Sequence, residues 1–142
     1  MSYLDTKQAL IQQLLTVTSA LFTADDIAYE NNTFDPASKT AWLESFFIPA
    51  TSEANSKDVN ATYEDRGTFQ VSVFVKLNSG DYDNNQLQIV DDILKSFKSN
   101  SSIVYNDQVV DILDSTVNNG LSSDAWFKRD ISINYFTFSA RT

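Results

Sequence analysis

The sequence predicts an α+β fold in which a mainly antiparallel sheet of four to five strands carries two helices packed on one face. Apolar residues recur at helical spacing in two segments, residues 3–22 and 82–99. Elsewhere they follow the alternation that is typical of strands, and turn-rich connections suggest hairpins. The expected order of elements is α-β-β-(β)-α-β-β.

The first helix is expected over residues 3–22, where Leu4, Ile11 and Leu14 lie on one face. Ser2 followed by Asp5 suits a capped helix start. A short strand is expected at residues 27–30. The stretch 31-NNTFDPASK-39 then predicts a loop, because it combines a proline with Asn, Asp and Ser.

A strand is expected over residues 41–49, ending at the proline. Both of its faces are apolar, with Leu43 and Phe47 on one side and Trp42, Phe46 and Ile48 on the other. Residues 50–65 are polar and unpatterned. They are interpreted as either a mobile loop or the arms of an extended hairpin.

The next strand shows the clearest alternation in the chain. On one side lie Phe69, Val71, Val73 and Val75, whereas the other side is polar except for Phe74. A break at residues 78–80 precedes the second helix, over residues 82–99. The first set of side chains is expected to face both helices and form the core.

Two strands are expected to complete the sheet, over residues 107–113 and 126–139, with a turn-rich loop at 114–120. In the last strand Ile131, Ile133 and Tyr135 share one face, but Phe136 and Phe138 fall on the other. A bulge near Tyr135 would bring both sets into one core. Without it, both faces of this strand are apolar.

Composition favours one folded domain over residues 1–142 and excludes several classes of function. The net charge of −9 argues against a nucleic-acid-binding or an anionic membrane surface. The chain has no His and no Cys, so the usual catalytic triads and zinc sites cannot form. No segment reaches the ~20 apolar residues of a membrane span, and the polar N-terminus does not suit a signal peptide.

One stretch comes near a calcium-binding loop. Asp81, Asp83, Asn85 and Asp92 fall at positions 1, 3, 5 and 12 of such a loop. Gln86 stands where the loop requires glycine, and Asp92 is shorter than the usual Glu. The acidic start of a helix is the favoured interpretation.

The apolar second face of the sheet predicts an assembly subunit, because two helices cover only one face and exposed apolar patches mark protein contacts. The candidate interface residues are Trp42, Phe46, Phe74 and Arg66. Trp42 and Trp126 could also form a ligand platform, although packing is the favoured interpretation. Arg66 suits either a local ion pair with Glu64 or Asp65, or a salt bridge to another subunit.

Several stretches resemble the tail terminator proteins of long-tailed bacteriophages. They are 1-MSYLDTKQALIQQLL-15, 30-ENNTFDPASKTAWLESFFIPA-50, 63-YEDRGTFQVSVFVK-76, 86-QLQIVDDILKSF-97 and 126-WFKRDISINYFTFSA-140. The resemblance spans nearly the whole chain. It rests on patterns of strand and loop, since the family has no catalytic signature to match.

The resemblance implies a structural protein of the virion tail, with no enzymatic activity and no cofactor. It implies a homo-oligomeric ring, typically a hexamer, that caps the tail tube, ends tail elongation and joins the head. The implied partners are the major tail tube protein and a head-completion or connector protein, with genomic DNA passing through the lumen unbound. An acidic lumen would suit the net charge of −9. Arg66 is then a candidate inter-subunit contact.

Two alternatives remain open from the sequence. One is another head–tail joining or neck protein, which would share the virion setting. The other is a small monomeric ligand-binding domain or a carboxylate enzyme, because carboxylate pairs need neither His nor Cys. The adjacent pairs Glu64–Asp65 and Asp91–Asp92 are interpreted as solvated surface, since neighbours on one element point apart.

Overall fold

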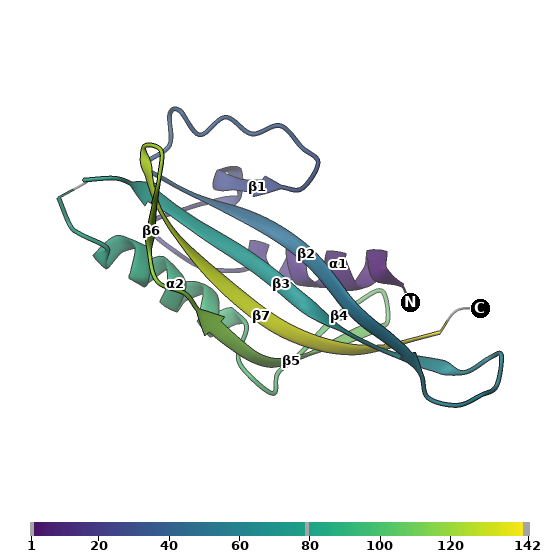
Figure 1. Cartoon of the computed structure of the whole chain (residues 1–142). Coiled ribbons are helices and arrows are strands. Elements are labelled where there is room, and N and C mark those ends of the chain that lie inside the picture. Colours follow the sequence, from purple (N-terminus) through teal and green to yellow (C-terminus); the bar gives the residue numbers. More distant parts are fainter. Residues whose placement is uncertain (1, 79, 141–142) are drawn as a thin grey trace.

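The computed structural model describes residues 2–78 and 80–140, so Ser79 of the predicted break lies outside the described residues. Figure 1 shows the arrangement of the elements. In chain order they are α1 (Tyr3–Leu15), the short 3-10 helix η1 (Ala24–Asp26), β1 (Ile27–Tyr29), β2 (Ala41–Ala54), β3 (Thr62–Lys76), α2 (Asn84–Ser96), β4 (Ser102–Tyr105), β5 (Gln108–Val117), β6 (Leu121–Ser123) and β7 (Trp126–Ala140).

The predicted fold class was wrong, because the fold is mostly β. The described strands form one curled sheet of seven strands in the order β1-β2-β3-β7-β5-β4, with β6 paired to one end of β7. The sheet is mixed, since β1 runs parallel to β2 whereas every other pairing is antiparallel. Among the described residues three strands precede α2 and four follow it, whereas two or three strands before the second helix and two after it were expected.

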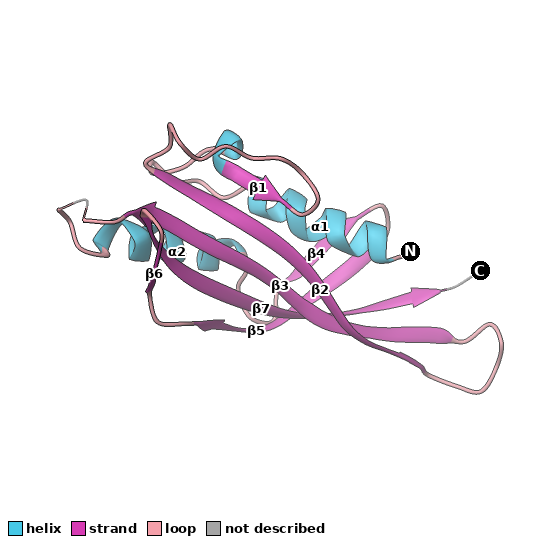
Figure 2. Ribbon diagram, turned by 45° about the horizontal axis from the view of Figure 1, so that its top comes forward, coloured by secondary structure: helices cyan, strands magenta, loops and turns pink. Residues whose placement is uncertain are grey.

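The core lies between the sheet and the two helices, which pack against the same face (Figures 1 and 2). This helix face is formed by the apolar set of β3 together with buried residues of its neighbours, including Leu43 of β2 and Ile131 and Ile133 of β7. Leu10 and Leu14 of α1 and Ile89 and Ile93 of α2 complete the core. The prediction that Phe69, Val71, Val73 and Val75 form the core with the helices is therefore confirmed.

The hairpin of β2 and β3 is longer than the sequence suggests and extends beyond the helices (Figure 2). Pairing continues past Pro49 to Ala54 opposite Tyr63, with a bulge between Pro49 and Thr51. Proline is tolerated here because β1 pairs only with Leu43–Ser45, which leaves Pro49 on an edge. Residues 50–54 and 62–65 are thus the arms of an extended hairpin.

The bulge expected near Tyr135 lies in the opposite strand. Register between β3 and β7 is continuous through Tyr135, whereas the β5–β7 register shifts between Ile112 and Asp114. Phe136 and Phe138 therefore stay on the face opposite Tyr135. Neither α1 nor α2 is long and apolar enough to cross a bilayer.

Candidate functional site

The face of the sheet opposite the helices, here called the open face, carries the side chains that the sequence singled out. It bears Thr68, Gln70, Ser72 and Phe74 of β3 and the residues that pair with them. Its apolar residues fall into two groups, one at each end of β3, with polar side chains between them. The two groups differ in how far the chain itself covers them.

The first group, the covered aromatic cluster, contains Ala28, Trp42 and Phe74, with Phe34 and Trp126 packed against it. Trp42 stacks on Phe74 at 4.0 Å between ring centroids, and Phe34 stacks on Trp42 at 5.2 Å. Trp126 meets Trp42 edge-on at 6.0 Å. Phe74 is only 7% exposed as a result, so the apolar surface expected at this residue is covered within the chain.

An ion pair ties down the loop that brings Phe34 to this cluster. Lys39 Nζ lies 2.9 Å from Asp26 Oδ1, and the other carboxylate oxygen of Asp26 accepts the Thr23 backbone N–H at 2.8 Å. Burial alone would raise the pKa of Asp26, but Lys39 and the Thr23 hydrogen bond outweigh it and lower that pKa. The ion pair thereby ties Lys39, near the end of the loop between β1 and β2, to η1.

The middle of the open face is a ladder of polar side chains, here called the polar belt. Ser72 Oγ donates to Asp130 Oδ1 at 2.6 Å, and Thr68 Oγ1 lies 2.8 Å from Asn134 Oδ1. Asn134 Nδ2 donates in turn to Asp114 Oδ1 at 2.5 Å. Cross-strand hydrogen bonds of this kind stabilise a sheet.

The second apolar group, here called the apolar ledge, is exposed and runs from β7 to the edge of the sheet. Phe136 and Phe138 meet edge-on at 5.0 Å, and Phe138 is 46% exposed. Beyond them Val109 of β5 and Val104 of β4 face each other in register, 46% and 67% exposed. Contiguous exposed apolar side chains of this kind mark a contact surface.

The four interface candidates thus lie on one face but in different settings. Trp42 and Phe74 belong to the covered aromatic cluster, whereas Phe46 is half-buried opposite Gln70. Arg66 is exposed at the other end, where its guanidinium donates to Glu64 Oε1 and lies 5.2 Å above the Phe136 ring. Only Arg66 therefore adjoins the apolar ledge.

The residues of the calcium-loop pattern are engaged separately along the start of α2. Asp81 Oδ2 accepts the Asn85 backbone N–H at 3.2 Å, Asp83 binds Arg129, and Asp92 accepts from Gln88 at 3.0 Å. Asn85 and Asp92 both lie within the helix. Asp81 and Asp83 precede the first turn of α2, and the pattern is helical from Asn84 to Asp92.

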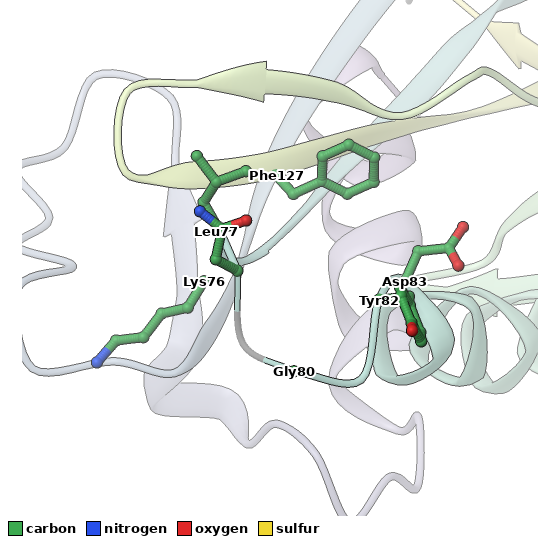
Figure 3. A pocket seen from close by; sticks show the side chains of 7 residues that line it. Lys76, Leu77, Gly80, Tyr82, Asp83 and Phe127 are labelled. Carbon is green, nitrogen blue, oxygen red and sulfur yellow. The ribbon is translucent and has the colours of Figure 1, made fainter.

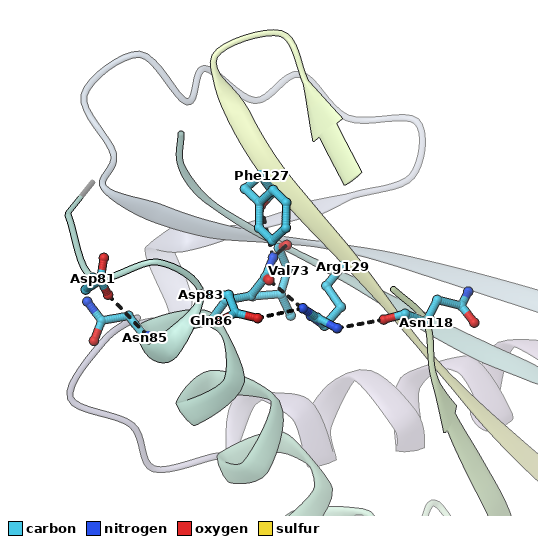
Figure 4. Close-up of polar contacts among 8 residues, drawn as sticks. All are labelled: Val73, Asp81, Asp83, Asn85, Gln86, Asn118, Phe127 and Arg129. Atoms are coloured by element: carbon cyan, nitrogen blue, oxygen red, sulfur yellow. Dashed lines mark hydrogen bonds and ion pairs between the residues drawn. The ribbon is translucent and has the colours of Figure 1, made fainter. Parts of the chain in front are cut away.

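Arg129 fastens α2 to the sheet, a role that the sequence did not indicate (Figure 4). Its guanidinium donates to Gln86 Oε1 at 3.1 Å, Asp83 Oδ2 at 2.9 Å and the Asn118 carbonyl at 3.0 Å. The Gln86 amide donates on to the carbonyls of Val73 and Phe127, both at 3.0 Å. The only signal in the sequence was an arginine at an inward-facing position of a strand.

A pocket of about 520 Å³ opens beside the start of α2, between the ends of β3 and β7 (Figure 3). Its lining is Lys76, Leu77, Asn78, Gly80, Tyr82, Asp83 and Phe127. Asp83 already pairs with Arg129, and Lys76 is the other charged residue of the lining.

Residues 5–135 match the family described as phage tail terminator protein. The chain belongs to the phage tail terminator protein family. The family is structural rather than enzymatic, so this chain is a structural protein of a bacteriophage tail. No curated protein matches the chain.

The fold of this family member also occurs in a solved structure. The two chains superpose with a TM-score of 0.74 at 21% sequence identity, and the match covers 96% of each chain. At that identity the likeness concerns the fold alone. It shows that the curled sheet with two helices on one face is an established arrangement.

Proposed function

We propose that the protein is a tail terminator that assembles into a homo-oligomeric ring, a hexamer by resemblance to its family, on the end of the phage tail tube. In this role it ends tail elongation and offers the surface to which the head is joined. The observation that carries the proposal is the family match over residues 5–135, nearly the whole chain. Its partners are the major tail tube protein and a head-completion or connector protein.

The open face supports the ring with a candidate contact between subunits. Arg66 is exposed and next to the apolar ledge, and Ile48 on the same face is 44% exposed. Phe46 adds a half-buried ring beside them. Trp42 and Phe74 lie at the other end of the open face, where they are covered within the chain.

The charge of the chain supports an unbound passage of DNA through the ring. The net charge of −9 disfavours adhesion of a polyanion. The polar belt contributes Asp114 and Asp130, and only Asp130 has a nearby lysine, at 3.7 Å. We place the protein at the head-proximal end of the tail, after assembly in the host cytoplasm.

Two measurements test this function. A phage genome that lacks this gene is expected to give tails of abnormal and variable length, seen by negative-stain electron microscopy. Tails of normal length that fail to join heads would instead identify a neck protein. Purified protein imaged alone and with tube ends should show closed rings, and a strictly monomeric chain that ignores tubes would contradict the proposal.

A further inference from the structure

The two edges of the sheet differ in what their backbones offer. An unpaired edge presents a row of N–H and C=O groups that another strand can bind. Proteins usually block such edges with proline, bulges, charges or covering segments. In the described chain the part of β2 that β1 leaves unpaired is blocked in this way, whereas β4 is not.

The edge at β2 is blocked beyond its pairing with β1. Glu30 Oε1 accepts the Phe47 backbone N–H at 2.6 Å, so this outward group is capped. Pro49, two residues on, has no N–H to offer. The bulge between Pro49 and Thr51 then breaks the regular spacing of the edge.

The edge at β4 is open. Ile112 donates its backbone N–H to the Ser101 carbonyl, and the register of β4 with β5 places Tyr105 opposite Gln108 across a two-residue turn. Since hydrogen-bonded and non-hydrogen-bonded pairs alternate, the backbone groups of Ser102 and Val104 face away from β5. Among the described residues no strand pairs with this side of β4.

The surroundings of this edge favour a partner of one kind. The side chain of Val104 is 67% exposed and continues into Val109, so an apolar side chain of an added strand would be covered there. Residues 99–125 contain four aspartates, at positions 107, 111, 114 and 124, and no lysine or arginine. Three of these aspartates, at positions 107, 111 and 114, lie in the β4–β5 hairpin, and an acidic hairpin attracts a basic segment and repels an acidic one.

We propose that the outer edge of β4 is a docking site for an extended, basic segment of another protein, which adds to the sheet as a further strand. A second copy of this chain does not fit the site. Two β4 edges would bring the aspartates of both copies together, and the β2 edge is blocked. The proposal rests on the edge and its charge, so it stands apart from the ring.

The test uses a synthetic eight-residue peptide of alternating valine and lysine, N-methylated along one side so that a single hydrogen-bonding edge remains. It is titrated into the full-length ¹⁵N-labelled protein. We expect saturable shifts in the amides of Ser102–Tyr105, with a Kd below about 1 mM. Absence of saturable shifts there, or saturable binding elsewhere alone, would overturn the proposal.

Two control peptides separate strand addition from charge attraction. A peptide N-methylated on both sides keeps the charge but lacks the edge, and we expect it to bind at least about tenfold more weakly. A peptide with glutamate in place of lysine keeps the edge but reverses the charge, and we expect a similar loss. If either control bound as tightly as the first peptide, the proposal that a basic strand adds to the β4 edge would be wrong.

A matched pair of variants then places the site. Val104→Lys puts a positive charge at the edge and should raise the Kd of the first peptide at least about tenfold. Val59→Lys makes the same change at a residue that is 86% exposed in the β2–β3 turn, and should leave the Kd within about twofold. If both variants bind alike, the peptide does not occupy the β4 edge.

Discussion

Phe74 stacks face to face on Trp42, with ring centroids 4.0 Å apart and ring planes 5° apart. The ring that breaks the polar pattern of β3 is thus matched by a ring in the strand opposite, because Trp42 and Phe74 are paired in register. Phe34 then covers this pair from the loop between β1 and β2. The open face therefore has a small core of its own.

The first prediction concerns this second core. Phe74→Ser should lower the free energy of unfolding by about 3 kcal/mol, because it removes a buried ring and leaves a cavity beside Trp42. Urea denaturation followed by tryptophan fluorescence measures it directly. Phe138→Ser serves as the control at a 46% exposed ring and should cost less than about 1 kcal/mol. A stable Phe74→Ser chain that fails only in assembly would return Phe74 to the subunit interface.

The second prediction concerns Gly67 and Tyr135, which face each other across β3 and β7. A Cβ at Gly67 would lie 2.5 Å from the Tyr135 hydroxyl oxygen and 2.6 Å from the Ile48 carbonyl oxygen. Gly67→Ala should therefore destabilise the fold by about 2 kcal/mol or more through overpacking. Gly80→Ala is the control, since nothing lies within 4 Å there and only its φ of +95° opposes the change.

Tyr135→Phe completes a double-mutant cycle with Gly67→Ala. The Tyr135 hydroxyl is buried with no hydrogen-bond partner among the described residues, so its removal should be neutral or stabilising. Burial, helped by Asp65 and Tyr3, raises the pKa of this phenol, which stays neutral at physiological pH. Part of the cost of Gly67→Ala should vanish in the Tyr135→Phe background. Strict additivity would show that the Tyr135 hydroxyl is not the cause of the clash, which would then come from the Ile48 carbonyl and the ring carbon Cζ of Tyr135.

The third prediction is a pH dependence that arises from Asp26 and Lys39. The pKa of Asp26 in the folded state lies below the ordinary value of an aspartate, so its ion pair stabilises the fold at any pH above that ordinary value. This contribution is lost as the pH falls through the lowered folded-state pKa. We expect Asp26→Asn to cost about 1 kcal/mol or less near pH 7, because the pair is partly exposed.

The same comparison at low pH supplies the control. Below the folded-state pKa of Asp26, wild type and Asp26→Asn should unfold at the same urea concentration, since the carboxyl is then neutral in both states. Lys39→Met should behave like Asp26→Asn near neutral pH. A difference between wild type and Asp26→Asn that stays constant across the titration would mean that the ion pair does not tie down the loop.

The fourth prediction concerns Arg129, whose side chain is 14% exposed. Arg129→Met keeps the stem but leaves Asp83 and the Gln86 carbonyl oxygen without their donor. We expect a loss of about 2–3 kcal/mol, as for other part-buried charged hydrogen bonds. Hydrogen exchange should speed up first at the start of α2. Lys128→Met removes a neighbouring, more exposed charge and should change stability by less than about 1 kcal/mol.

The sequence predicted the strand over residues 68–76 and its core side chains well, because their alternation reflects burial on one face. It missed β4 and β6, which are four and three residues long. The two residues before β5, Asn106 and Asp107, adopt positive φ, which is the geometry of a tight hairpin turn. The sequence signal for this hairpin was an Asn-Asp pair between two short apolar stretches.

Other features depend on contacts between different elements, which the sequence of a single strand does not reveal. The pattern around Tyr135 indicated a bulge, but which of two paired strands carries it is decided by the partner, here β5. The helix expected over residues 3–22 ends at Leu15, although the apolar spacing continues. Likewise nothing in the sequence places Phe34 over Trp42, so Phe74 was expected to be uncovered. Loop placement over a sheet is a tertiary property.

The last prediction tests the proposed contact between subunits. Arg66→Glu reverses an exposed charge whose partner in the chain is Glu64, so the fold should lose less than about 1 kcal/mol. Assembly on tail tubes should nevertheless fail, because a like charge at a docking surface opposes association. Ring formation is scored by electron microscopy and by mass in solution.

Two variants make the outcome of Arg66→Glu specific. Lys57→Glu makes the same charge change in the turn between β2 and β3 and should assemble normally if contact lies at Arg66 rather than at the hairpin tip. Glu64→Arg combined with Arg66→Glu restores the ion pair with its charges exchanged. If that double variant assembles, the role of Arg66 is limited to the ion pair with residue 64 of the same strand. If it stays monomeric while folded, the guanidinium of Arg66 contacts the neighbour, as proposed.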